Sequence, residues 1–88
     1  MDDDSRKHVL KRLAYIEGHL AGVRRMIDED TYCVDVLKQT YAIRRAIEKM
    51  EAKMLEGHLH HCVMDAMHEG RPDEVFGELV ELYRVANK

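Results

Sequence analysis

The chain has 88 residues, enough for one domain with a modest core, so oligomerisation is a natural source of further stability. It is 45% hydrophobic and 35% charged, contains no apolar run long enough to cross a bilayer, and starts with an acidic segment unlike a signal peptide. The formal net charge of -3 argues against indiscriminate nucleic-acid binding, although basic residues can still gather on one face. We therefore expect a cytoplasmic protein with no membrane partner.

The first helix is predicted over residues 5–29. Ser5 is a suitable N-cap, and the acidic run at 28–30 disfavours continuation of a helix at its C-terminus. Apolar residues recur every three or four positions and share one stripe: Val9, Leu13, Ile16, Leu20, Val23 and Ile27.

The second helix is predicted over residues 32–69, where no proline interrupts the chain. Its apolar seam advances in steps of four and three and consists of Val36, Thr40, Ile43, Ile47, Met50 and Met54. Cys33, Gly57 and His61 continue this seam at its ends. The seam is too long for one subunit of this size to cover, so we expect a partner chain to cover it.

The third helix is predicted over residues 74–86, after the stop signal at 70–72 and with Asp73 as its cap. Strand patterns, internal repeats and linkers are absent from the sequence. The predicted fold is therefore all-α: a single domain over residues 1–88, built from three helices of which the central one is long.

The two cysteines of a cytoplasmic chain favour metal binding or redox chemistry over a structural disulfide. His58 and Cys62, four residues apart, lie one turn apart on one helix face, as two ligands of one metal would. Cys33 precedes His58 by 25 positions, about 37 Å along a continuous helix, whereas metal–ligand bonds measure only about 2.0–2.3 Å. The three residues of one chain therefore cannot bind the same ion.

Two central helices placed antiparallel across a two-fold axis would bring Cys33 of one chain beside His58 and Cys62 of the other. The midpoint of this pairing lies near Ile47. The apolar centre of the dimer interface would then consist of Ile43, Ile47, Met50 and Met54. Such a dimer carries two equivalent sites, one at each end.

Two thiolates and one imidazole form a soft, three-coordinate ligand set that suits copper(I). Zinc prefers a fourth ligand, which His61 or a water could supply, so zinc stays open at this point. His61 could equally be a packed residue or a hydrogen-bonding neighbour of the ligands. The alternative to a metal site is that the cysteines are simply small buried apolar residues.

Three stretches resemble the copper-sensitive operon repressor (CsoR/RcnR) family, and together the resemblance covers nearly the whole chain. Residues 12–27 (RLAYIEGHLAGVRRMI) resemble its first helix, residues 32–39 (YCVDVLKQ) the start of its second, and residues 58–63 (HLHHCV) its second ligand motif. The resemblance implies antiparallel dimers that assemble into a dimer of dimers. It also implies a shared copper(I) site formed by Cys33, His58 and Cys62, with Tyr32 and Glu78 linking that site to DNA affinity.

Basic residues lie in rows along two helices. They are Arg6, Lys7, Lys11, Arg12, Arg24 and Arg25 on the first helix, and Lys38, Arg45, Lys49 and Lys53 on the second. Such rows suit contacts to phosphates, although a solvated surface with intrahelical ion pairs would look the same in a sequence. Together with the family resemblance they predict operator duplex DNA as the partner. The predicted contacts are Arg12, Lys49, Arg45 and Lys53.

The predicted function is therefore a copper(I)-sensing transcriptional repressor and not an enzyme. The metal-free protein would bind its operator, and copper(I) would release it and derepress genes of copper resistance or efflux. One alternative is a persulfide- or thiol-responsive repressor of the same family that links Cys33 and Cys62 of opposite chains; another is a copper buffer with no DNA role. The resemblance associates the absence of the histidine with persulfide sensing, and a histidine in place of Cys62 with nickel or cobalt. The presence of His58 and Cys62 therefore favours copper.

Overall fold

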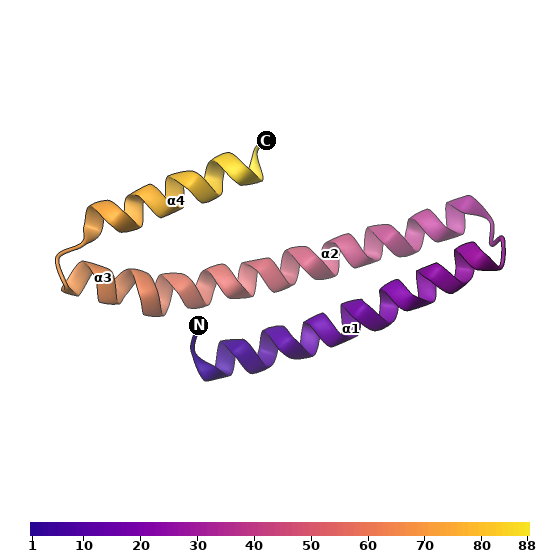
Figure 1. Cartoon of the computed structure of the whole chain (residues 1–88), viewed down its shortest axis with the longest axis horizontal. Helices are drawn as coiled ribbons and strands as arrows, with labels where there is room; N and C mark the ends of the chain where they lie inside the picture. The colour runs from indigo at the N-terminus through magenta and orange to yellow at the C-terminus, as the bar shows by residue number, and fades with distance from the viewer.

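A computed structural model describes all 88 residues as three helical rods without strands (Figure 1). The first rod is α1 (Asp3–Asp28). The second is continuous and consists of α2 (Cys33–Gly57), the π-helical segment η1 (His58–Val63) and α3 (Met64–His68). The third is α4 (Pro72–Ala86). None of these helices is both long and apolar enough to pass through a bilayer.

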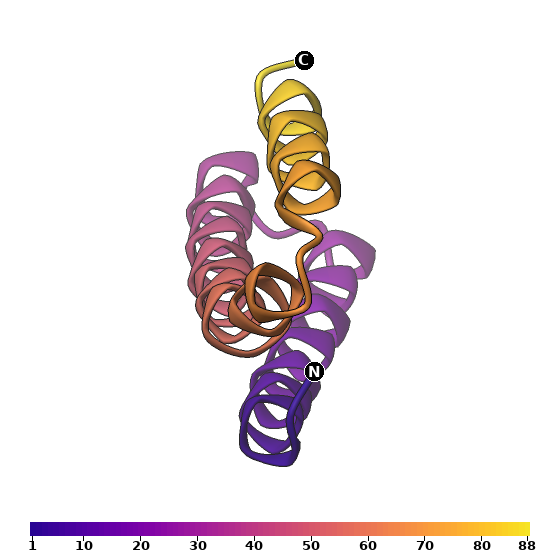
Figure 2. The same cartoon turned by 90° about the vertical axis from the view of Figure 1, so that its left-hand side faces the viewer.

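The rods are arranged in an elongated molecule of 56 × 30 × 14 Å. α1 runs antiparallel along α2, and α4 turns back from the end of α3 on another side of the middle rod (Figures 1 and 2). The two turns use backbone conformations with positive φ, at Asp30 (57°) and Gly70 (75°). Glycine adopts such a conformation without steric penalty, which agrees with the predicted stop at residue 70.

The main core lies between α1 and α2. Val9, Ile16 and Val23 are buried at seven-residue intervals along α1, and Ile16 and Val23 pack against buried Ile43 of α2. The surrounding residues of this core are Val36, Ala46, Ile47 and Met50. The prediction that a partner chain covers the α2 seam is therefore wrong: α1 of the same chain covers it. The predicted centre of the dimer interface is wrong for the same reason. Of its four residues, Ile43, Ile47 and Met50 pack in the core with α1.

Two helix caps also differ from the sequence predictions. Asp2, not Ser5, is the N-cap of α1, and its carboxylate accepts the backbone N–H of Ser5 at 3.2 Å. Ser5 is instead buried in the first turn. α4 begins at Pro72 rather than after Asp73, because proline suits the first position of a helix, where no backbone N–H is required.

Apolar side chains remain exposed on all three rods, and only 8 of the 88 residues are buried. On α2 the exposed residues include Leu37, Tyr41, Leu55 and, in η1, Leu59. At about 100° per residue this second stripe lies roughly a third of a turn away from the seam that α1 covers. On the other rods, the exposed apolar residues include Leu20 and Ile27 of α1 and Phe76, Val80 and Tyr83 of α4.

Candidate metal centre

The three predicted ligands lie at opposite ends of the middle rod. Cys33 is the first residue of α2, whereas His58 and Cys62 belong to η1 beyond its end. Because the rod is continuous, Cys33 and His58 of one chain are about 37 Å apart at about 1.5 Å per residue. No three His, Cys, Asp or Glu side chains of the single chain are close enough to hold one metal ion. The geometry therefore excludes a three-ligand site made of these residues within one subunit.

His58 and Cys62 share the single π-helical turn η1. π-helical turns inside α-helices are rare and are found mainly at functional sites. Both residues line a largely apolar cavity of about 680 Å³ between the middle rod and α4, together with Leu79 and Leu82. Both cysteines are free thiols on exposed residues. The paired imidazole and thiol are thus presented at the rim of an apolar surface and not inside the core.

Glu78 of α4 contacts His58 of the middle rod. One carboxylate oxygen lies 3.3 Å from Nε2 of His58. A carboxylate that accepts a hydrogen bond from one ring N–H fixes the ring orientation and leaves the other ring nitrogen free to bind a metal. Glu78 thus touches one of the three predicted ligands, and its role in DNA affinity stays a prediction. Tyr32 is exposed at the N-cap of α2, beside Cys33 at the opposite end of the rod.

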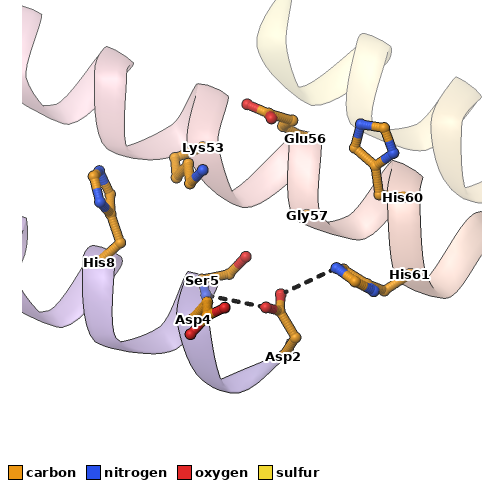
Figure 3. A pocket seen from close by; sticks show the side chains of 9 residues that line it. All are labelled: Asp2, Asp4, Ser5, His8, Lys53, Glu56, Gly57, His60 and His61. Atoms are coloured by element: carbon orange, nitrogen blue, oxygen red, sulfur yellow. Dashed lines mark hydrogen bonds and ion pairs between the residues drawn. The ribbon is translucent and has the colours of Figure 1, made fainter.

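His61 does not line this cavity, and its ring points toward Asp2 at the start of α1 (Figure 3). Its Nε2 lies 3.6 Å from Oδ1 of Asp2, the residue that caps α1. Hydrogen bonding by Ser5 holds the pKa of the Asp2 carboxyl below its ordinary value. Sequence reasoning did not single out Asp2; the available signal was an acidic residue three positions before Ser5 at the start of a predicted helix.

A second, polar cavity of about 300 Å³ surrounds this contact, and no apolar residue lines it. Here α1 and the middle rod approach each other closely: a Cβ atom added to Gly57 would lie 2.8 Å from Oγ of Ser5. Glycine at this position permits the approach because it has no side chain. The start of α1 is thus seated directly against the segment that bears His58 and Cys62.

The predicted DNA contacts carry positive charge that no acidic side chain of the chain neutralises. Arg12 donates from Nε to His8 at 3.0 Å, and no salt bridge engages Arg45, Lys49 or Lys53. Among the basic residues of these rows, Arg6 alone forms an intrahelical ion pair, with Asp3 at 3.9 Å. His8 and Lys53 line the same polar cavity, which brings basic residues of α1 and α2 to one region (Figure 3).

Comparison with known proteins gives consistent matches over almost the whole chain. Residues 5–85 match the family described as metal-sensitive transcriptional repressor. The chain is 36% identical over 80 residues to the copper-sensing transcriptional repressor CsoR of Bacillus subtilis (strain 168), covering 91% of this chain and 79% of that protein.

Two solved structures have similar folds. The copper-sensing repressor CsoR with Cu(I) from Geobacillus thermodenitrificans NG80-2 superposes with a TM-score of 0.94 at 33% identity, covering 100% of this chain and 92% of that one. The nickel-responsive transcriptional regulator InrS superposes with a TM-score of 0.76 at 35% identity, covering 89% of each chain.

Proposed function

The chain belongs to the family of metal-sensitive transcriptional repressors, and on this premise we propose that it is a copper(I)-responsive repressor. Members of this family are transcriptional repressors and not enzymes. In the proposed cycle the metal-free protein occupies operator DNA in the cytoplasm, and binding of copper(I) releases it. Genes for copper resistance or efflux would then be derepressed.

The observation that carries the proposal is the separation of the ligands along one continuous rod. Cys33 can share an ion with an imidazole and a thiol only if these belong to another chain, and an antiparallel partner would meet it with His58 and Cys62 of the partner subunit. The exposed stripe at Leu37, Tyr41 and Leu55 is an apolar face of α2 that α1 leaves free for this contact. We propose that two such dimers then pair into a dimer of dimers.

The donor set fits copper(I). Two thiolates and one imidazole are soft ligands, and three of them satisfy this ion, whereas zinc prefers a fourth. His61, the nearest candidate for a fourth ligand, is directed at Asp2 instead. Copper(I), when bound, would connect the start of α2 in one chain, at Cys33, to segment η1 of the other chain. Within the chain Glu78 would orient the ring of His58 through Nε2.

DNA binding is proposed to use the basic residues of both long helices, with Arg12 on α1 and Arg45, Lys49 and Lys53 on α2 facing phosphates. Release follows from linkage: if copper(I) favours an arrangement in which these rows no longer fit the duplex, DNA must weaken copper binding by the same factor. Typical factors of this kind are about 5- to 150-fold.

The decisive experiment compares the affinity for the DNA upstream of its own gene with and without one equivalent of copper(I) per chain, under anaerobic conditions. We expect tight binding without metal and a large loss with it. Equal affinity in both states would remove the switch even if copper binds. Absence of DNA binding in both states would leave the copper buffer as the better function. X-ray absorption on the same sample should count two sulfur neighbours and one nitrogen neighbour.

A thiol-responsive repressor is the second candidate, supported by the exposure of both Cys33 and Cys62. In that function, sulfur species would link the two cysteines of opposite chains without a role for His58. The two candidates share fold, assembly and DNA partner, and differ only in whether the imidazole is needed.

A further inference from the structure

One residue, Asp2, contacts both the start of α1 and the ligand-bearing segment η1. Its Oδ2 accepts the backbone N–H of Ser5 and caps α1, while its Oδ1 faces His61 of η1 (Figure 3). The remaining exposed acids of the first turn, Asp3 and Asp4, make no contact of this kind: Asp3 pairs only with Arg6, at 3.9 Å.

The contact between Asp2 and His61 lies just outside hydrogen-bond length. Oδ1 of Asp2 is buried and has no hydrogen-bond partner, and Nε2 of His61 stands 3.6 Å away. A buried carboxylate oxygen without a donor is unfavourable, so a shift of a few tenths of an ångström that closes this gap is favoured. A small movement of η1 therefore decides whether this bond is made.

His61 moves with the ligands because all three residues belong to the same π-helical turn. His58, His61 and Cys62 lie within six consecutive residues of η1. Any adjustment of the backbone that brings His58 and Cys62 onto a metal ion must also displace His61. The close approach of Gly57 to Ser5, which leaves no room for a Cβ, seats the first turn of α1 beside this segment.

We propose that Asp2 is a positioning residue that acts through His61: it fastens the start of α1 to η1 and so transmits the state of the ligand turn to the basic residues of α1. This inference rests on the proposed function, because it assumes that copper(I) at His58 and Cys62 controls DNA affinity. Arg6, Lys7, Lys11 and Arg12 follow the cap within three turns of helix, so a displacement of the cap displaces them as well.

The test uses the full chain and Asp2→Ser. Serine is also a good N-cap, so α1 keeps its first turn. The serine side chain is uncharged and is too short to contact His61. Asp4→Ser is the matched control, since it makes the same change of charge in the same turn and leaves the pairing with η1 in place. Asp2→Asn, which keeps the shape and the cap, replaces Asp2→Ser if serine lowers the melting temperature.

The quantity measured is the ratio of DNA affinities without and with copper(I), using the DNA upstream of its own gene. We expect wild type and Asp4→Ser to give the same ratio, and Asp2→Ser a ratio about two- to fivefold smaller, the range of a partly exposed ion pair. Copper(I) stoichiometry and melting temperature should be unchanged. In a His61→Ala background Asp2→Ser should have no further effect.

The outcomes separate the two proposals. If wild type responds to copper(I) and Asp2→Ser responds equally, the role of Asp2 is refuted and the proposed function stands. A further effect of Asp2→Ser in the His61→Ala background would equally overturn the route through His61. If wild type itself shows no response, the proposed function fails and the inference fails with it.

Discussion

The carboxylate of Glu78 lies 3.3 Å from Nε2 of His58, so the last helix of the chain touches the imidazole that we propose as a copper ligand. Replacing Glu78 with glutamine removes the charge that orients this ring. We expect copper(I) affinity to fall about tenfold, as is typical when a partner of a ligating histidine is removed, measured by competition with a copper(I) chelator. Glu81→Gln, an exposed acid of the same helix without a partner, should bind copper(I) like wild type.

The imidazole of His58 distinguishes the copper sensor from the thiol sensor. His58→Ala should abolish release from DNA by copper(I), because only the two thiols of each proposed site remain. The measurement is a DNA mobility shift with copper(I) in one arm and a persulfide donor in the other. Retention of the copper(I) response would contradict the proposed ligand set, and a wild-type response to the persulfide alone would favour the second candidate.

Sharing of each site between two chains can be tested by mixing variants. Cys33→Ala and Cys62→Ala chains should each bind no copper(I) at the site, since every site in a pure dimer lacks one thiol. After the two are unfolded together and refolded, each mixed dimer regains one complete site, made of Cys33 from one chain and Cys62 from the other. Copper(I) titration should therefore show binding only in the mixture. If the mixture binds no more copper(I) than the separate variants, the site is not shared between two chains.

Lys49 is predicted to face phosphate, and no acidic side chain pairs with it. Lys49→Ala should weaken DNA binding at low salt without changing sequence preference. The slope of log affinity against log salt should become shallower by about 0.9 for each phosphate that the variant no longer neutralises. Lys88→Ala, at the C-terminal residue, is the control of equal charge change. An unchanged slope for Lys49→Ala would place DNA on another face.

The two apolar stripes of α2 should respond differently to truncation. Ile43 is 5% exposed and packs against α1, so Ile43→Ala should lower the free energy of unfolding by about 2–5 kcal/mol. Leu37 is exposed on the chain, so Leu37→Ala should act mainly on dimer dissociation, measured by analytical ultracentrifugation. If Ile43→Ala instead weakens the dimer, and Leu37→Ala does not change dimer dissociation, the assignment of the two stripes is wrong.

Several features of the fold followed from sequence reasoning because they depend on local order. The three rods were predicted from apolar spacing and from the absence of proline before Pro72, since helical hydrogen bonds join residues close in the chain. The separation of Cys33 from His58 followed directly from this continuity. The contacts of individual side chains could not be predicted in the same way. Ser5 was expected to cap α1, whereas Asp2 caps this helix and also faces His61.

By itself, then, the sequence determined the three helical rods, and the fact that a thiol lies at one end of the middle rod and an imidazole–thiol pair at the other. Only the tertiary structure decided which face of α2 belongs to α1. The seam is apolar along the whole helix, whereas the exposed apolar residues form two separate pairs, Leu37 with Tyr41 and Leu55 with Leu59. This spacing does not say which of the two faces packs against α1 and which stays free. Burial of Ile16 and Val23 against Ile43 makes the choice, because that is the contact in which α1 removes its own apolar stripe from water.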